Sequence, residues 1–525
     1  MKPANSRRDE VLQSLEDQGG LRPGISESIH RETGVPAAQV YGAATFYHLL
    51  KNPDVRHWVC EGLSCKLAGS DALMSRSLCA EESSAYSPCL GRCDSAPASW
   101  KPHALPDFPP ASLSPRTTPL ALDLGGGDRD SYAALSICAQ RGPDWVIGEL
   151  EASGLTGRGG AGFPAHLKWG MVRAQAEPTR YLVMNADEGE PGTFKDREIM
   201  LRRPHLVIES LAIGALTIGA KGILISIRGE YGDARVALER ALEVARGEGR
   251  LVGLAPTVTW TLVSGHGAYI CGEETALLEA LEGKRGMPRM KPPFPTEVGL
   301  FGKPTLIQNV ETMACIPAIL ERGGSWFRGL GRTEPGTKLY CLSGHVERPG
   351  VYEAPLGITL RELLELGGGV KGTLQAFSPG GASSGFLPAD KIDVPLDFSH
   401  LKAVGSMLGS AGVVVLNDTV DMSEAALIQA RFFESESCGQ CAPCRIGTQV
   451  LSQAIQRFRN PGVGGNAQPG AACFSHVDDV AWGMAEASIC GLGQAASLPL
   501  TSAMKYFPEQ FEANRTRNDT GEDPS

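Results

Sequence analysis

The chain lacks a long uninterrupted apolar run, and this absence argues against a membrane-spanning helix. Its most apolar stretch, residues 206–227, is interrupted by Glu209 and Lys221, whereas a span needs about 20 predominantly apolar residues. Residues 1–25 are polar and contain no apolar segment of the kind that a secretory signal carries. We therefore expect a cytoplasmic protein with no membrane span.

The chain also lacks an excess of basic residues. It has 49 Lys and Arg against 59 Asp and Glu, which gives a formal net charge of −10 and a pI near 5.6. Nucleic-acid binding draws on a basic surface, so we expect no nucleic-acid partner. Aromatic residues make up only 6% of the chain, but 64 glycines exceed the usual share of about 7%. This excess of glycine indicates close approach of the backbone to ligands.

The length and the pattern of the sequence predict several domains of mixed α/β type. A chain of 525 residues is expected to hold about three or four domains. A proline-rich stretch at residues 101–119 predicts a linker, and we place the divisions at 1–115, 116–335, 336–420 and 421–525. We expect a small β-grasp-like domain in the third unit and a helical, metal-carrying bundle in the fourth.

The second unit alternates apolar runs with amphipathic ones. Strands are expected at 181–185, 223–227 and 258–263, and helices at 205–219 and 233–246. This alternation is typical of parallel β-α-β units with helices on the faces of the sheet. Ligands of such sheets bind at the carboxyl ends of the strands.

Fourteen cysteines without an export signal indicate metal or redox chemistry rather than disulfides. Cys438, Cys441 and Cys444 are spaced as C-x-x-C-x-x-C, and Cys490 follows in a distant segment. Four thiolates from a tight loop and a distant segment are the ligand set of a [4Fe–4S] cluster. Two alternatives remain at this stage: a structural zinc site, and Cys473 in place of Cys490.

A second group of cysteines consists of two pairs near the amino terminus. Cys60-x4-Cys65 and Cys89-x3-Cys93 can each hold one iron of a [2Fe–2S] cluster. The alternatives are a degenerate domain and a zinc knuckle. The isolated cysteines are expected to be small buried residues; they are Cys79, Cys138, Cys271, Cys315 and Cys341.

A glycine-rich segment contains Gly157-x-Gly159-x-x-Gly162. Glycines at this spacing let backbone N–H groups approach a phosphate or a flat ring system. A glycine turn without a ligand is the alternative, because the segment does not follow a clear strand.

Polar groups follow the strand at 181–185. Asn185, Asp187, Glu188 and Glu190 stand at its predicted carboxyl end, where they suit the hydroxyls of ribityl or ribose. A phosphate would need Lys168 and glycine amides instead. A solvated acidic loop or a divalent-cation site is the alternative.

The order of the motifs GRGGAGFP, NADEGEPGTFKDR, YICGEE, KPPFP, NVET, SCGQCAPCR and SICGLGQ resembles one family. It is the NADH-oxidising flavoprotein subunit of respiratory complex I, with relatives in soluble formate dehydrogenases and NAD-reducing hydrogenases. The motifs VYGAATFY and CLGRCDSAPA resemble the small thioredoxin-like [2Fe–2S] subunit of the same enzymes, here fused at the amino end. Among fused relatives, SPGGASSGFLPA, IDVPLDF, GLGQAAS and MKYFPEQF look most similar to the β subunit of NAD-linked formate dehydrogenase.

The resemblance implies a fold, cofactors and a partner. The expected domains are thioredoxin-like, Rossmann-like for FMN and NAD, β-grasp-like of the SLBB type, and helical with the [4Fe–4S] cluster. The implied FMN contacts are Gly157, Arg158, Gly159, Lys168, Asn185, Asp187, Glu188, Tyr269, Gly272, Glu273, Asn309 and Thr312. The implied NAD(H) contacts are Gly160, Phe163, Glu190, Glu274 and Phe294. The implied partner is a catalytic α subunit that carries molybdenum– or tungsten–pterin and iron–sulfur clusters.

We therefore expect electrons from formate to pass through the clusters and FMN to NAD+, with Glu190 orienting the nicotinamide or tuning the flavin. The alternative enzyme is the diaphorase subunit of an NAD-reducing hydrogenase or of complex I. The alternative from another class is an iron–sulfur scaffold without flavin chemistry. It draws on two departures from the family pattern, Gln308 where relatives usually have asparagine and Met171 at an often aromatic position.

Overall fold

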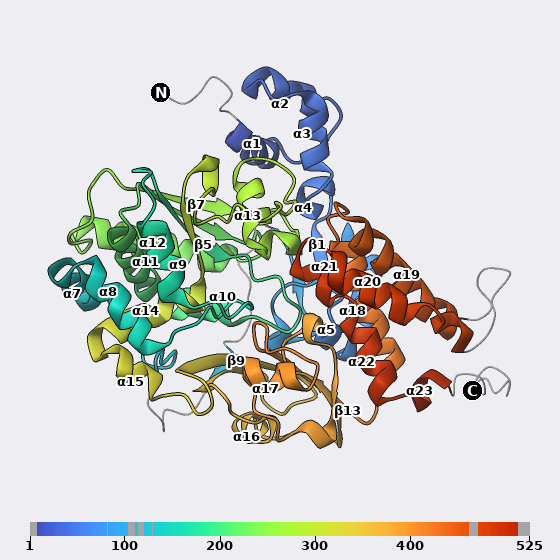
Figure 1. Ribbon diagram of the computed structural model, residues 1–525. Helices are drawn as coiled ribbons and strands as arrows, with labels where there is room; N and C mark the ends of the chain where they lie inside the picture. The colour runs from blue at the N-terminus through green and yellow to red at the C-terminus, as the bar shows by residue number, and fades with distance from the viewer. Residues whose placement is uncertain are drawn as a thin grey trace.

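The computed structural model describes residues 8–80, 82–102, 111–113, 120–128, 130–460 and 471–512. In these residues the chain forms three sheets and a group of carboxyl-terminal helices (Figure 1). The parallel-sheet unit and the carboxyl-terminal helices lie at opposite sides of the molecule in both ribbon views. No helix in the described ranges is long and apolar enough to cross a membrane.

The amino-terminal unit begins with short helices and continues into a small sheet. The helices are η1 (Arg8–Glu10), α1 (Val11–Asp17), α2 (Ile25–Thr33), α3 (Ala37–Ala44) and α4 (His48–Lys51). The sheet unit comprises β1 (His57–Cys60), α5 (Leu63–Leu67), α6 (Ser70–Cys79), β2 (Ser84–Ser87), η2 (Cys93–Ser95) and β3 (Ser99–Trp100). Strand β1 lies between β2, which is parallel to it, and β3, which is antiparallel. The parallel pair is connected through α5 and α6, as parallel strands require.

The second unit is built on a sheet of four parallel strands in the order β7-β6-β5-β8. Its strands are β5 (Tyr181–Ala186), β6 (Gly222–Ile227), β7 (Thr259–Ser264) and β8 (Thr305–Asn309). Its larger helices are α7 (Ala133–Arg141), α8 (Pro143–Ser153), α9 (Ala165–Arg173), α10 (Lys195–Arg202), α11 (Pro204–Ile218), α12 (Gly232–Gly247), α13 (Glu274–Leu281) and α14 (Val310–Arg322). Shorter elements are η3 (Tyr269–Gly272), η4 (Leu300–Gly302) and α15 (Gly324–Arg328). The expected strands and helices of this unit are therefore present.

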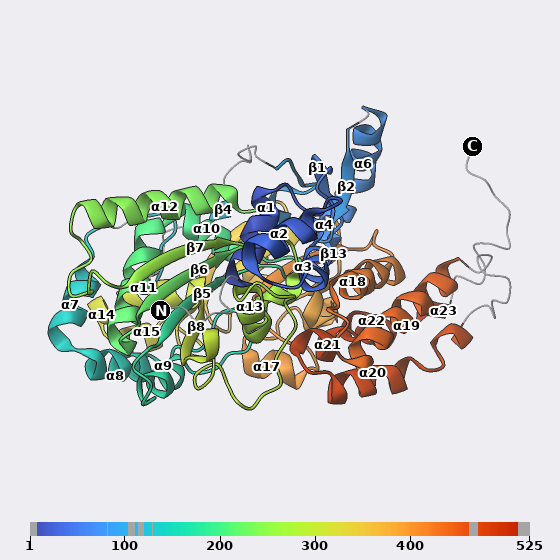
Figure 2. The ribbon, with the colours of Figure 1, turned by 90° about the horizontal axis from the view of Figure 1, so that it is seen from above.

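The two faces of this sheet pack against different helices (Figure 2). Leu182 and Met184 of β5 belong to the large apolar cluster that includes α11, α12 and α14. Val183, which lies between them, packs with Leu277 of α13 in a separate cluster. Because successive side chains of a strand point to opposite faces, β5 is apolar on both. Helix α11 is buried nearly all round, which is typical of a helix enclosed by a core.

The third unit is a six-stranded sheet in the order β12-β11-β13-β9-β10-β4. Its strands are β9 (Thr337–Gly344), β10 (Gly350–Pro355), β11 (Leu374–Ser378), β12 (Leu387–Pro388) and β13 (Gly412–Asn417), with β4 (Ser112–Leu113) at the edge. The helices are α16 (Leu360–Leu366), η5 (Ala382–Ser384), η6 (Ala389–Lys391) and α17 (Phe398–Ala403). Strand β4 comes from the stretch expected to be only a linker and pairs in parallel with β10. Residues 103–110 and 114–119 of that linker lie outside the described residues.

The last unit is helical, with α18 (Met422–Glu436), α19 (Ala442–Arg459), η7 (Ala471–Phe474), α20 (Val477–Ala487), α21 (Gly491–Ala495), α22 (Leu498–Tyr506) and α23 (Glu509–Glu512). One apolar cluster joins this unit to the amino-terminal helices: it contains Leu15, Tyr47, Ile270 and Phe433. The predicted divisions at residues 115, 335 and 420 stay predictions, because the packing crosses from one unit to another.

Four isolated cysteines are buried as expected, but Cys79 is exposed at the end of α6, so the expectation was wrong there.

Candidate functional site

The order of the parallel strands makes β5 and β8 neighbours, with their carboxyl ends at one edge of the sheet. The chain runs outward from β5 through β6 to β7 and then returns to place β8 on the other side of β5. A reversal of this kind is the topological switch point at which open α/β sheets bind ligands. Asn309 is the last residue of β8 and Asn185 the next-to-last residue of β5, and the two stand opposite each other in register. Two predicted cofactor contacts are thus adjacent.

Each asparagine is fixed by its neighbours. The Asn185 Nδ2 atom donates to the Gly272 carbonyl at 2.8 Å, which brings two predicted FMN contacts together. Asn309 caps α14, because its Oδ1 atom accepts the Glu311 N–H at 3.0 Å. Beside Asn309, Gln308 is buried within β8.

The glycine-rich segment folds over the end of β8. The Gly157 N–H donates to the Phe163 carbonyl at 2.8 Å, and the Arg158 N–H donates to Thr312 Oγ1 at 2.8 Å. A Cβ added to Gly159 would lie 2.9 Å from the Asn309 Cβ, so this position requires glycine. A Cβ on Gly160 would meet nothing within 4 Å, which leaves this edge of the loop open. The loop therefore has one side packed against the protein and one side accessible to a flat ligand.

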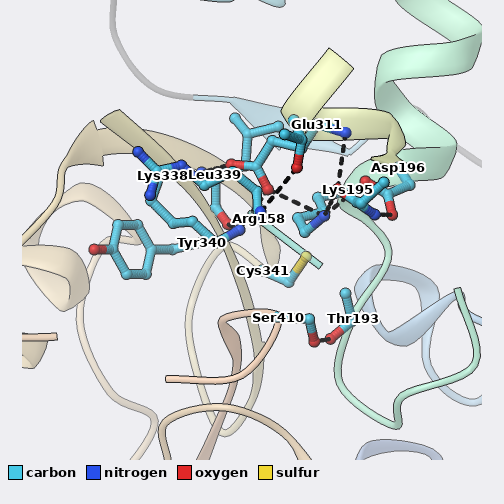
Figure 3. Close-up of polar contacts among 12 residues, drawn as sticks. Arg158, Thr193, Lys195, Asp196, Glu311, Lys338, Leu339, Tyr340, Cys341 and Ser410 are labelled. Carbon is cyan, nitrogen blue, oxygen red and sulfur yellow. Dashed lines mark hydrogen bonds and ion pairs between the residues drawn. The ribbon is translucent and has the colours of Figure 1, made fainter. Parts of the chain in front are cut away.

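The side chain of Arg158, a residue of this loop, lies near a group of buried charges (Figure 3). The Lys195 Nζ atom is 2.6 Å from Asp196 Oδ1 and 3.0 Å from Glu311 Oε2, and Lys338 of β9 pairs with the same Glu311 oxygen. Asp196 also accepts a 2.6 Å hydrogen bond from the Asn309 Nδ2 atom. This network therefore connects the β-grasp sheet to the residue that caps α14.

The charges in this network suit a phosphate. Lys195 and Lys338 pair with Asp196 and Glu311. Arg158 adds a third cation, and its buried Nε has no hydrogen-bond partner. Burial lowers the pKa of Lys338 to about 8. A helix N-terminus such as that of α14 attracts anions, and the loop and the asparagines offer polar groups nearby. The residues present therefore fit FMN.

The carboxyl groups of the acidic loop after β5 are buried or half-buried, and they differ in their hydrogen bonds. Burial raises the pKa of Asp187 to about 7 and also raises the pKa of Glu188 to about 7. The Glu188 carboxylate accepts the N–H groups of Asp196 at 2.9 Å and Arg197 at 3.2 Å. Glu188 therefore caps α10 in this structure rather than offering both its oxygens to a ligand.

Glu190 lies where the loop meets the β-grasp unit. The Tyr269 hydroxyl donates to Glu190 Oε2 at 2.5 Å, so two predicted site residues are in contact. Burial raises the pKa of Glu190 to about 7, and the hydrogen bonds from Tyr269 and Ser383 act in the opposite direction. Sequence reasoning missed Ser383, which stands in a glycine- and serine-rich turn of a different domain.

The outer edge of the site carries exposed apolar side chains. Phe163 is 45% exposed and Phe294 is 51% exposed, as suits rings that stack on an adenine. Met171 is likewise 45% exposed.

An ion-pair chain lies at the same edge. The Lys168 Nζ atom donates to Glu274 Oε2 at 2.8 Å, and Lys291 reaches Glu273 at 2.9 Å and Glu274 at 3.3 Å. Glu273 also caps α13. The Lys168 ammonium therefore pairs with Glu274 and is not part of the network formed by Lys195, Lys338, Asp196 and Glu311.

The carboxyl-terminal cysteines converge in one cavity. Its lining contains Cys438, Cys441, Cys444 and Cys490, together with Ile270, Pro288, Gln440, Ile489 and Leu492. A Cβ added to Gly493 would lie 2.8 Å from the Cys444 Cβ, so glycine lets α21 approach α19 and brings Cys490 beside the other three. Cys473 is not among the lining residues. Ile270 belongs to η3, whose first residue is Tyr269 of the flavin site, so the cavity borders that site.

The amino-terminal cysteines Cys60, Cys65, Cys89 and Cys93 are all buried. Backbone N–H groups point at the sulfurs, from Gly91 to Cys89 at 3.3 Å and from Ala98 to Cys65 at 3.4 Å. Donors of this kind stabilise thiolates in iron–sulfur sites. Four buried cysteines, two of which accept such a donor, fit a [2Fe–2S] cluster.

Two arginines hold this loop against the parallel-sheet unit. Arg228 Nη2 donates to the Cys89 carbonyl at 2.6 Å, while its Nη1 donates to the Glu188 carbonyl at 2.6 Å. Arg197 Nη1 donates to the Gly91 carbonyl at 2.7 Å. Sequence reasoning missed both arginines, although Arg228 follows β6 directly and the strand-end rule would have found it.

Four descriptions of protein families match successive parts of the chain. The thioredoxin-like [2Fe-2S] ferredoxin matches residues 7–102, the Nuo51 FMN-binding domain 150–318, the SLBB domain 339–387, and the NADH-ubiquinone oxidoreductase-F iron-sulfur binding region 424–514. These matches confirm the predicted fold class and the predicted FMN, [4Fe–4S] and [2Fe–2S] cofactors, and they replace the zinc alternatives.

Relatives and solved structures agree with these matches. An F-type subunit of NADH-quinone oxidoreductase from Rhizobium meliloti (strain 1021) is 46% identical over 75% of this chain and 93% of its own length. The corresponding F-type subunit of Rickettsia conorii (strain ATCC VR-613 / Malish 7) is 43% identical over 75% and 93%. A chain of NAD+-reducing [NiFe]-hydrogenase in the H2-reduced state superposes with a TM-score of 0.87 and 30% identity, over 98% of this chain and 97% of that one. The air-oxidised state gives a TM-score of 0.86 at 30% identity, over 98% and 94%.

Proposed function

The chain belongs to the family of F-type NADH-quinone oxidoreductase subunits, and from this premise we propose that it is the β (diaphorase) subunit of an NAD-dependent formate dehydrogenase. Its role as a flavoprotein subunit of an NAD(H)-dependent oxidoreductase follows from the family itself. In the proposed complex, a partner subunit with a molybdenum– or tungsten–pterin site oxidises formate to CO2, and this chain delivers the electrons to NAD+.

One observation supports the proposal that this diaphorase has the amino-terminal cysteine unit and the flavin unit fused in one chain. The superposition with the hydrogenase chain includes the amino-terminal cysteine unit as well as the flavin unit, since it extends over 98% of this chain. The F-type relatives match only about three quarters of it. This supports a single polypeptide that holds both iron–sulfur sites and the flavin site.

Different residues at this edge of the sheet are assigned to binding FMN and to orienting the dinucleotide. FMN supplies the exchange between hydride and single-electron transfer when it is bound. We assign its phosphate end to the N-terminus of α14 and the buried cations below, and its ribityl hydroxyls to Asn185 and Asp187. The glycine loop and the exposed Phe163 and Phe294 leave room for the dinucleotide over the open face. Glu190, fixed by Tyr269, is placed to orient the nicotinamide.

Both cysteine sites are adjacent to residues of the flavin site. Tyr269 and Ile270 are consecutive residues of η3: the first contacts Glu190 and the second lines the [4Fe–4S] cavity. Electrons arriving from the partner therefore have a short protein path from this cavity to the flavin. On the other side, Arg228 bridges Glu188 and Cys89 through their carbonyls, so the [2Fe–2S] site is also adjacent to the acidic loop.

Formate as the ultimate donor is proposed from the similarity of the segments SPGGASSGFLPA, IDVPLDF, GLGQAAS and MKYFPEQF to the formate dehydrogenase β subunit. The second candidate is the diaphorase subunit of an NAD-reducing hydrogenase, and the hydrogenase superposition favours it. The two share the electron path within this chain and differ in the partner.

The deciding experiment is anaerobic purification of the chain with its native partners, followed by metal and flavin analysis and donor-dependent NAD+ reduction. We expect FMN, about six iron atoms per chain, molybdenum or tungsten in the partner, and formate-dependent activity. Nickel in the partner with hydrogen-dependent activity would assign the chain to the hydrogenase. A preparation with iron but neither FMN nor NADH:ferricyanide activity would refute both and leave an iron–sulfur scaffold.

A further inference from the structure

A turn of the SLBB domain reaches into the flavin unit and contacts Glu190. The Ser383 N–H donates to Glu190 Oε1 at 2.8 Å, and the Ser383 hydroxyl donates to Glu190 Oε2 at 3.0 Å. The Tyr269 hydroxyl lies 2.5 Å from the same Oε2 atom and 3.2 Å from the Ser383 hydroxyl. Two domains therefore supply three donors to one carboxylate.

The turn approaches so closely that it needs glycine. Gly381 has φ of 84°, and a Cβ on it would lie 2.6 Å from Glu190 Cγ and 2.7 Å from the Pro191 carbonyl oxygen. A side chain at this position would push the turn away from Glu190. The glycine therefore serves the contact with Glu190 as well as the turn itself.

The shape of the turn is maintained by residues other than Ser383. Ser378 Oγ lies 2.6 Å from the Gly381 carbonyl oxygen and 2.8 Å from the Gly385 carbonyl oxygen, and its one proton can be donated to either. Ser384 Oγ, which is buried, accepts the Gly380 N–H at 3.0 Å, and Phe386 N–H donates to Ser502 of α22 at 2.8 Å. Ser383 is only half-buried, and its N–H and hydroxyl bond to the Glu190–Tyr269 pair. The turn is thus held by hydrogen bonds that do not involve the Ser383 hydroxyl.

We propose that Ser383 is a positioning residue of the flavin site, which acts through Glu190 by holding its carboxylate in one orientation toward the bound nicotinamide. This proposal rests on the proposed function and deepens it, because it gives the SLBB domain a part in the redox site. Hydrogen bonds to an ionised carboxylate are stronger than those between neutral groups, so the pair of Ser383 donors fixes both oxygens. A fixed carboxylate restricts the approach of the nicotinamide to one geometry, and small displacements of such groups are costly.

The same contact determines the charge beside the flavin. Burial favours the neutral form of Glu190, whereas the donors from Tyr269 and Ser383 favour the ionised form. Removal of the Ser383 hydroxyl weakens the ionised form and lowers the negative charge near the ring. A lower negative charge stabilises the reduced, more anionic flavin, so its midpoint potential should rise.

The test compares Ser383→Ala, Ser383→Thr and a control, Ser399→Ala, in the purified complex. Ser399 is exposed and bonds to Glu334 through its hydroxyl and N–H, so its change should leave the flavin site unaffected. For Ser383→Ala we expect unchanged FMN content, a higher flavin midpoint potential in spectroelectrochemical titration, and kcat/KM for NADH about 10- to 100-fold lower, which is the effect of one hydrogen bond to a charged group. Ser383→Thr keeps the hydroxyl, so its flavin midpoint potential and its kcat/KM for NADH should be close to those of the wild type.

A double variant separates positioning from damage to the fold. In the Glu190→Gln background, Ser383→Ala should cause less than about twofold further change, because the residue through which it acts has been altered. Equal effects of Ser383→Ala in both backgrounds, or a wild-type potential in Ser383→Ala, would overturn the proposal. If the unmodified complex lacks FMN or NADH:ferricyanide activity, the proposed function fails instead, and this outcome is read from the wild type alone.

Discussion

Glu311→Gln removes a carboxylate that two buried lysines share. Glu311 Oε2 pairs with Lys195 at 3.0 Å and with Lys338, and Glu311 Oε1 accepts the Leu339 N–H at 2.9 Å. All three charged side chains are at most 1% exposed. The glutamine side chain keeps a carbonyl oxygen that can accept the Leu339 N–H, but it places a neutral amide beside the charged Lys195 and Lys338. Breaking a buried pair from one side costs about 3–5 kcal/mol, and we expect that loss of unfolding free energy here.

Lys338→Met tests the same network from the other side. Its loss leaves Glu311 paired with Lys195, and methionine fills the apolar part of the space. Burial already lowers the pKa of Lys338 to about 8, which indicates that its charged form is held at a cost. Removing one member of a buried pair is costly when it leaves the other charge uncompensated, and here Glu311 keeps Lys195 as its partner. We therefore expect a loss of about 1 kcal/mol or less, clearly smaller than that of Glu311→Gln.

The assay is thermal and urea unfolding of the flavin-free chain, with Asp393→Asn as the matched control. Asp393 pairs with Arg361 on the surface at 2.7 Å, where the two side chains are 62% and 55% exposed, so the control should leave the stability nearly unchanged. A loss of about 3 kcal/mol corresponds to roughly 6–12 °C in the melting temperature of a unit of this size. A Glu311→Gln variant within about 1 kcal/mol of the wild type, or a Lys338→Met variant as unstable as Glu311→Gln, would refute the reasoning.

Three further predictions concern the cofactor sites. Phe294→Ala should raise KM for NADH about fivefold to tenfold with FMN content unchanged, since it removes one stacking face; an unchanged KM would contradict the adenine assignment. Cys490→Ser should abolish the [4Fe–4S] signal in electron paramagnetic resonance, whereas Cys473→Ser should retain it; the reverse would make Cys473 the ligand. The folded chain holds a proton on Asp187, whose pKa is about 7, at pH values where the unfolded chain has lost it. This contribution to stability therefore falls as pH rises from about 4 to 7, and Asp187→Asn should reduce the drop in melting temperature of the flavin-free chain between pH 5 and pH 8.

The local pattern of the sequence was sufficient for the parallel-sheet unit. The predicted strand at 181–185 is β5 (Tyr181–Ala186), and the helices predicted at 205–219 and 233–246 are α11 and α12 within one residue at each end. Periodicity and apolar runs are properties of a few consecutive residues, so they can be read without knowing what packs on them. The exception is β4, which forms from a proline-rich stretch because β10 has a free edge beside it.

Those parts of the candidate site could be predicted whose residues form a motif with a characteristic spacing along the chain. Cys438, Cys441 and Cys444, the two amino-terminal cysteine pairs and the polar groups after β5 stand close together in the chain, whereas Cys490 lies in a distant segment and joins its group in the cavity. Glu188 shows the limit of such reasoning: it stands in the predicted motif, but its carboxylate caps α10. Which of several neighbouring carboxylates points at a ligand depends on the direction of the chain after the strand, and spacing does not encode that direction.

The sequence by itself determined the kinds of domain, the cofactors and the strand-end location of the site, because each depends on local spacing or on motifs in a fixed order. Only the tertiary structure decided which distant groups act on the site. Ser383 meets Glu190 across 193 residues, and Lys338 meets Glu311 between two domains. Contacts of this kind arise from the packing of whole domains, and the buried charges and close glycines at these junctions have their roles only once the domains are in place.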